Sequence, residues 1–206
     1  MPSWPAAMQR NRMQDRPPAR IVRPQQLVPS AWANGRGRTR VISRRPDVAA
    51  GETAGGFIWR LSLAELEADA DFSTLPGIDR VFVLATTGPV IINVESMASI
   101  LKLGQAARFP GEASVTVTLP AGSPQLGLNL MTRQDSCTGE LSVEFRDGEV
   151  HLDPDEGVIS TMVLAGRARL IDGRTLKELD TLVMGDEAQR LTTHGALLAT
   201  ATVLGC

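Results

Sequence analysis

Arg60 is the side chain with the clearest chemical potential in this sequence, because it lies within an apolar segment over residues 57–62. Its neighbours Trp59 and Leu61 predict a buried strand. Alternate side chains of a strand point to opposite faces, so Arg60 shares its face with Ser62. A buried guanidinium needs a partner, since leaving it unpaired costs several kcal/mol. That partner is either an internal carboxylate, in a structural role, or the carboxylate of a small ligand, which arginine binds through two parallel hydrogen bonds.

Three further side chains are candidates for the same kind of site. Asn129 interrupts the apolar segment 128–131, where it either satisfies a neighbouring strand or orients a ligand. Trp32 and Asn34 belong to a predicted turn that contains an Asn-Gly pair, which favours positive φ. The indole of Trp32 serves either core packing or a pocket wall, and the residues alone leave both interpretations open.

Metal and nucleophile chemistry find little support in the sequence. A mononuclear metal site needs about three or four converging ligands. The chain has only two histidines, His151 and His194, 43 positions apart. Gly-x-Ser-x-Gly, phosphate-binding and dinucleotide-binding motifs are absent. Cys137 is interpreted as a structural free thiol and Cys206 as a mobile one. We therefore expect no metal, no cofactor and no catalytic nucleophile.

The elements that position these residues are predicted to be short strands. The chain has 206 residues, 43% hydrophobic and 21% charged, with 19 Gly and 13 Pro, as expected for a globular protein rich in turns. Short apolar segments alternate with Gly- and Pro-containing turns from about residue 20 onward, and the Asp147-Gly148 pair predicts a hairpin. Residues 63–70 (LAELEADA) predict one short helix. The predicted fold class is all-β.

Charge and hydropathy limit the partners. Residues 1–45 carry ten Arg and one Asp, whereas residues 46–206 carry eleven basic and twenty-two acidic side chains. Residues 1–20 predict a disordered basic extension. Nucleic acid is not an expected partner, because no basic patch is interleaved with aromatic residues. The sequence has no run of 18 apolar residues and no apolar signal segment, so we expect a cytoplasmic protein without a membrane span.

Two short likenesses suggest an internal duplication. Residues 82–85 (FVLA) resemble residues 162–165 (MVLA), and residues 109–112 (FPGE) resemble residues 183–186 (VMGD). The offsets of 80 and 74 positions fit two copies of one β unit, the second with an internal connection six residues shorter. We therefore predict two small β-barrels, a bicupin. The first, over residues 21–145, carries the candidate pocket, and the second, over residues 146–206, is mainly structural.

Four segments that come in the same order resemble the HutD/Ves family of small bicupins. They are residues 27–35 (LVPSAWANG), 57–64 (FIWRLSLA), 72–80 (FSTLPGIDR) and 129–133 (NLMTR). The resemblance implies RmlC-like jelly-roll barrels, no metal, and a regulatory role in bacterial histidine utilisation through binding an intermediate such as formylglutamate. It makes Arg60 the partner of the ligand carboxylate, and places Trp32, Asn34, Ser62 and Asn129 on motif positions.

The sequence also departs from the family pattern, and several functions stay open. Arg36, Arg38 and Val41 replace a Gly, a Thr and a Glu of the family pattern. Gly127 stands where an Asp is common, and Ala70-Asp71 stands where Gly-Pro is usual. Besides a binding protein for a small carboxylate metabolite, the alternatives are a Ves-like stress-linked protein, a metal-free cupin isomerase or hydrolase using Glu112 or His194, and an interaction module. The sequence leaves open whether the chain forms a homodimer.

Overall fold

The structure is a computed structural model, which describes residues 17–47 and 56–206. Two 3₁₀ turns, η1 (Pro24–Gln26) and η2 (Pro154–Glu156), are the helical elements of these two ranges. The strands in chain order are β1 (Arg20–Val22), β2 (Ser30–Ala31), β3 (Gly37–Pro46), β4 (Phe57–Leu66), β5 (Ala70–Asp71), β6 (Ile78–Leu84), β7 (Val90–Val94), β8 (Met97–Leu101), β9 (Ala106–Pro110), β10 (Val115–Thr118), β11 (Gln125–Arg133), β12 (Thr138–Leu152), β13 (Val158–Ala165), β14 (Ala168–Leu170), β15 (Thr175–Leu176), β16 (Thr181–Val183) and β17 (Gln189–Leu204). The fold is therefore all-β, as predicted.

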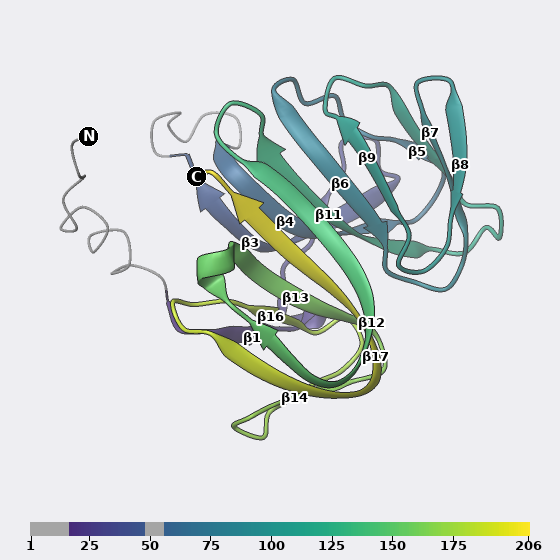
Figure 1. Cartoon of the computed structure of the whole chain (residues 1–206). Helices are drawn as coiled ribbons and strands as arrows, with labels where there is room; N and C mark the ends of the chain where they lie inside the picture. Colours follow the sequence, from purple (N-terminus) through teal and green to yellow (C-terminus); the bar gives the residue numbers. More distant parts are fainter. Residues whose placement is uncertain (1–16, 48–55) are drawn as a thin grey trace, which may run out of the picture.

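Three antiparallel sheets build the molecule (Figure 1). The first has the strand order β2-β3-β4-β11-β6-β9, and the second has the order β5-β10-β7-β8. These two sheets come from the first part of the chain. The third sheet runs β1-β16-β13-β17-β14-β15, with β12 paired along β17. Strand β1 therefore joins the sheet of the last part of the chain, where it pairs with β16.

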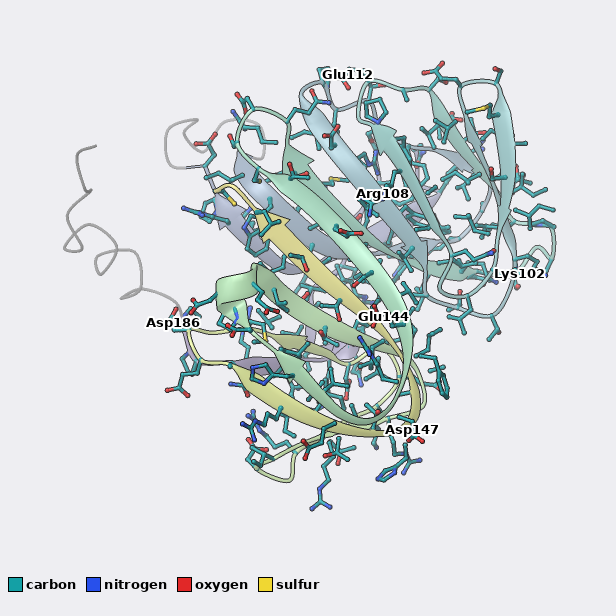
Figure 2. The ribbon with its side chains drawn as sticks, viewed as in Figure 1. Lys102, Arg108, Glu112, Glu144, Asp147 and Asp186 are labelled. Atoms are coloured by element: carbon teal, nitrogen blue, oxygen red, sulfur yellow. The ribbon has the colours of Figure 1, made fainter. Side chains whose placement is uncertain are left out.

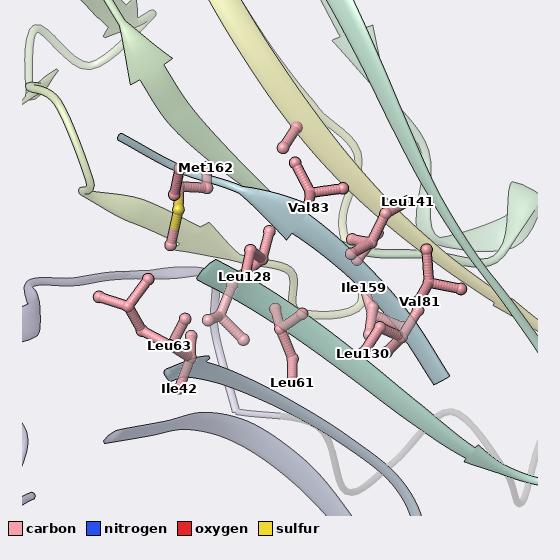
Figure 3. Close-up of a cluster of buried hydrophobic side chains, with 14 of the residues drawn as sticks. Ile42, Leu61, Leu63, Val81, Val83, Leu128, Leu130, Leu141, Ile159 and Met162 are labelled. Carbon is pink, nitrogen blue, oxygen red and sulfur yellow. The ribbon is translucent and has the colours of Figure 1, made fainter. Parts of the chain in front are cut away.

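The central strands β4, β6 and β11 are covered by side chains on both faces. One face, which includes Leu61, Val83 and Leu128, packs against side chains of the third sheet such as Ile159 and Met162 (Figure 3). The opposite face points into the first part of the molecule, where Phe82 and other apolar side chains form a separate core cluster. Burial on both faces explains why these strands are rich in apolar residues.

The predicted helix over residues 63–70 is wrong. Leu63 and Leu66 are fully buried members of β4, and this part of the strand pairs with β3 on one side and β11 on the other. The two hydrogen-bonded neighbours and the burial of both leucines outweigh the helix propensity of this Ala-, Leu- and Glu-rich segment, because tertiary contacts override local propensity.

The hairpin predicted at Asp147-Gly148 is also wrong. Strand β12 continues to Leu152 beside β17, and only the register shifts between Arg146 and Gly148. Gly148 takes a φ of 96°, and the Asp147 carboxylate accepts a hydrogen bond of 3.3 Å from the backbone N–H of Gly195. The dipeptide therefore forms a β-bulge that bends a long strand pair, a position where glycine with positive φ is favoured.

The division of the chain at residue 145 stays a prediction, and β12 spans that position. Most of the predicted extension over residues 1–20 lies outside the described residues. Within the described ranges, no helix is long and apolar enough to cross a membrane.

Candidate ligand-binding site

A cavity of about 590 Å³ opens inside the first part of the molecule. Its walls come from the segment around β2, from β3, β4, β6 and β11, and from the segment that follows β5. The lining residues are Ser30, Ala31, Trp32, Ala33, Asn34, Thr39, Val41, Arg60, Ala64, Asp71, Phe72, Ser73, Thr74, Leu75, Arg80, Asn129 and Met131. The volume is in the range of pockets for small molecules.

The register of the sheet brings the polar side chains together. Met131 of β11 lies directly between Arg60 of β4 and Arg80 of β6. In the next row, Asn129 is the cross-strand neighbour of both Ser62 and Phe82. Because side chains alternate along each strand, both rows point to the same face of the sheet. Two arginines and an asparagine are thus gathered in one cavity.

Arg60 is half-buried and forms no ion pair with a carboxylate in the part of the chain that the structure describes. Its Nη2 lies 3.0 Å from Sδ of Met131, and its guanidinium lies 4.8 Å from the ring centroid of Phe57. Its Nε is buried and has no hydrogen-bond partner. Burial, and secondly the positive charge of Arg44, lower the pKa of Arg60. The predicted inward direction of this side chain is consistent with its place in the cavity wall.

Arg80 is a second arginine of the cavity, which the sequence reasoning missed. Only 4% of it is exposed. Its Nη1 donates a 3.2 Å hydrogen bond to the backbone carbonyl of Ser73, and its guanidinium lies 4.6 Å from the Phe72 ring centroid and 5.2 Å from that of Phe109. Its buried Nε has no partner. Burial first, and then the charge of Arg60, lower the pKa of Arg80 to about 10.

Neither Arg60 nor Arg80 forms an ion pair with any residue that the structure describes. Their shared face therefore holds two positive charges, and the charge of Arg60 lowers the pKa of Arg80. Alternation along β6 could have indicated Arg80, since it precedes Phe82 by two positions in an apolar strand.

Ser62 and Asn129 are buried, with 1% and 3% exposed, respectively. Oγ of Ser62 and Oδ1 of Asn129 have no hydrogen-bond partner. Asn129 lines the cavity, whereas Ser62 lies beside it outside the lining. The structure therefore places Asn129 and Arg60 in the wall of the same cavity, whereas Ser62 is the cross-strand neighbour of Asn129.

Trp32 and Asn34 lie at the rim of the cavity. Nε1 of Trp32 donates a 2.8 Å hydrogen bond to Oγ1 of Thr39, and its ring centroid lies 6.2 Å from that of Phe72. Both interpretations of Trp32 thus hold, since the ring is packed and also lines the cavity. Oδ1 of Asn34 accepts a 3.0 Å hydrogen bond from the backbone N–H of Arg36, which is a turn contact.

The departures from the family pattern fall mostly outside the cavity. Arg36 donates to the backbone carbonyl of Asp69, and Arg38 pairs with Glu67. Val41 and Asp71 are the departures that line the cavity. Gly127 is required by packing, because a Cβ there would lie 2.0 Å from Cε2 of Phe82.

The acid–base candidates of the enzyme hypothesis lie outside the cavity lining. Glu112 is on the surface, at the edge of the molecule (Figure 2). It accepts a 2.6 Å hydrogen bond from the backbone N–H of Gly77, which lowers the pKa of this carboxyl. His151 and His194 are exposed on β12 and β17. Among residues 17–47 and 56–206, no three His, Cys, Asp or Glu side chains gather as metal ligands.

Comparison with known proteins agrees with this architecture. HutD of Pseudomonas fluorescens SBW25, in a formate condition, has a TM-score of 0.74 and 23% identity, covering 91% of this chain and 99% of that structure. A cupin 2 conserved barrel domain protein from Leptotrichia buccalis has a TM-score of 0.59 and 11% identity, covering 94% of this chain and 100% of that structure. The protein is therefore an all-β protein of the cupin fold.

The HutD family model matches residues 24–200, so the chain belongs to the HutD family. Protein Ves of Citrobacter koseri is 35% identical over 116 residues, which are 56% of this chain and 58% of that relative. The chain thus spans less than two thirds of the length of this curated relative. These matches confirm the resemblance to the HutD/Ves family.

Proposed function

We propose that this protein binds a small carboxylate metabolite in the cavity that Arg60 and Arg80 line. The observation that carries the proposal is that the half-buried Arg60 and the buried Arg80 line one cavity and form no ion pair with any described residue. An anionic ligand would supply the missing negative charge. Each hydrogen bond to a charged group contributes about 1.5–3 kcal/mol, so one carboxylate held by both arginines would contribute more than either contact alone.

The neighbouring acceptors narrow the class of ligand. Oδ1 of Asn129 is buried without a partner and lines the same cavity as the arginines. A buried acceptor of this kind favours a ligand that brings an N–H donor. An N-acylated amino acid carries both groups, and formylglutamate is one such compound. We therefore propose a cytoplasmic, metal-free binding protein that regulates histidine utilisation, as the family resemblance implies.

A Ves-like, stress-linked role is the second candidate, because protein Ves relatives match this chain over 116 residues. A metal-free cupin enzyme is the weaker alternative, since Glu112 and His194 do not line the cavity.

A thermal-shift screen tests the binding proposal. The full chain is heated with formylglutamate, glutamate, formate, urocanate or imidazolone propionate, each with wild type, Arg60→Ala and the control Arg167→Ala, which changes an exposed arginine outside the cavity. A ligand at one hundred times its Kd stabilises by about 2.7 kcal/mol, a rise in Tm of roughly 5–10 °C.

We expect one acid to raise the Tm of wild type and of Arg167→Ala but not of Arg60→Ala. Equal shifts in all three proteins would show that Arg60 does not bind the ligand. An unchanged Tm with all five acids would overturn the proposed role in histidine utilisation. Consumption of an acid by catalytic amounts of protein would favour the enzyme instead.

A further inference from the structure

A second cavity, of about 440 Å³, lies where β3 and β4 meet the third sheet. It is separate from the cavity of the proposed carboxylate site, and the two share no lining residue. Its residues are Pro17, Arg20, Ser43, Arg44, Arg45, Pro46, Trp59, Ile159, Val183, Met184 and Cys206. None of them has a role in the function proposed above.

Three arginines give this second cavity a positive charge. Arg20, Arg44 and Arg45 form no ion pair with another described residue. Among residues 17–47 and 56–206, no acidic side chain lines the cavity. A concave surface lined by one sign of charge raises the local concentration of ligands of the opposite sign. The cavity is therefore suited to an anionic molecule.

Two thiols meet at this cavity. Cys206 is half-buried and lines it, while Cys137 is buried behind it and contacts the backbone carbonyl of Ile58 through Sγ at 3.6 Å. Cys206 packs against the core cluster that contains Cys137, and a Cβ on Gly205 would lie 3.9 Å from Cα of Cys137. Burial, and secondly the contact with Cys206, raise the pKa of Cys137 to about 12. Cys206, which was interpreted as a mobile thiol, is in fact packed beside the central core cluster.

We propose that Cys137 and Cys206 form a thiol–disulfide exchange site, and that the arginine-lined cavity admits an anionic disulfide such as oxidised glutathione to it. Cys206 is the attacking thiol, because its side chain lines the cavity, and Cys137 is the resolving thiol, because it is enclosed behind Cys206.

The exchange proceeds in two balanced steps. The Cys206 thiolate attacks one sulfur of oxidised glutathione, so that a mixed disulfide forms and one glutathione leaves as a thiolate, which takes up a proton. Cys137 then loses its proton and attacks the Cys206 sulfur, which forms the Cys137–Cys206 disulfide and releases the second glutathione. The two protein thiols lose two electrons and two protons, and one disulfide becomes two thiols.

Intact-mass measurement after incubation with oxidised glutathione tests the chemistry. We expect wild type to lose two hydrogen atoms, Cys137→Ser to gain one glutathionyl group on Cys206, and Cys206→Ser to stay unmodified while folded. Urea-unfolded Cys206→Ser is the control, because its exposed Cys137 should react. Folded wild type that keeps both thiols, while the unfolded chain oxidises, would overturn the proposal.

The role of the arginines is tested by rate. We expect oxidised glutathione to react with Cys206 of the Cys137→Ser protein at least about tenfold faster than the uncharged 2-hydroxyethyl disulfide does, after correction for the rates of both reagents with a free model thiol. Adding Arg44→Glu should remove most of that preference, whereas adding Arg167→Glu, the same charge change outside the cavity, should leave it. Equal corrected rates with the two disulfides would overturn the role of the cavity.

Discussion

Replacing Arg80 by methionine should stabilise the protein without ligand while removing its capacity to bind a carboxylate. The pKa of Arg80, lowered from 12.5 to about 10, corresponds to about 3 kcal/mol against the charged side chain in the folded protein. The contacts with Phe72 and Phe109 and the hydrogen bond to Ser73 offset about 2 kcal/mol of this. Methionine fills irregular apolar space with an unbranched side chain. Arg80→Met should therefore raise the free energy of unfolding by about 1 kcal/mol.

Urea unfolding at pH 7, followed by circular dichroism, measures this change. A gain of about 1 kcal/mol also raises the Tm by about 2–4 °C for a chain of this size. Arg167→Met, at an exposed position, is the matched control and should stay within about 0.5 kcal/mol of wild type. With saturating carboxylate ligand the order should reverse, since the ligand stabilises only wild type.

A loss of stability in Arg80→Met would have the opposite meaning. If Arg80→Met lowers the free energy of unfolding by more than about 1 kcal/mol without ligand, the guanidinium makes a net stabilising contribution to the fold. Arg80 would then be a structural residue, and the argument from its missing partner would fail.

Three further predictions concern the packing around the site and the buried thiol. Gly127→Ala should lower the free energy of unfolding by about 1–3 kcal/mol in urea titrations, because its Cβ would lie 2.0 Å from the Phe82 ring. Gly77→Ala, where φ is 75° and no atom lies within 4 Å of the added Cβ, should lower it by only about 1–2 kcal/mol through backbone strain. Trp32→Phe should lose about 1 kcal/mol with the hydrogen bond to Thr39 but keep its carboxylate affinity in calorimetry, so a large loss of affinity would show that the indole N–H serves the ligand. The pKa of Cys137 is raised from 9.0 to about 12, so its thiol contributes stability in full below pH 9 and loses that contribution as the pH rises toward 12. The difference in the free energy of unfolding between wild type and Cys137→Ala should therefore shrink from pH 9 to pH 12. A constant difference over that range would contradict this prediction.

Much of the fold could be predicted from sequence, because alternation and turn residues are local signals. Strand β4 was expected from residue 57 onward, and its alternation agrees with the structure, where Arg60 lines the cavity and Leu61 joins the core cluster. The errors came at positions where pairing with a strand distant in sequence determines the local structure. Residues 63–66 continue β4 because β3 and β11 flank them, and Gly148 forms a bulge because β17 continues beside it. Neither partner strand is visible in the local sequence.

The candidate site was predictable in part, for the same physical reason. A polar side chain within an apolar segment stands out in the sequence, so Arg60 and Asn129 could be identified before the pairing of their strands was known. Arg80 follows an aspartate and begins its apolar stretch. Its alternation with Phe82 indicates the face to which it points, but only the pairing of β6 with β11 places it beside Met131. The meeting of Cys137 with Cys206 depends on packing between segments 69 positions apart, which no local pattern encodes.

The central claim is that Arg60 and Arg80 together bind one carboxylate ligand, and the Nε–H resonances of arginine test it most directly. Both Nε atoms are buried without a partner, so a bound carboxylate should change their surroundings. In ¹⁵N-labelled protein, with the two resonances assigned from Arg60→Lys and Arg80→Met, the account predicts that formylglutamate shifts both along one saturable curve with a single Kd. The neutral diamide of the same skeleton should shift neither. Two resonances that stay in place with formylglutamate and with each of the other four acids would contradict the account.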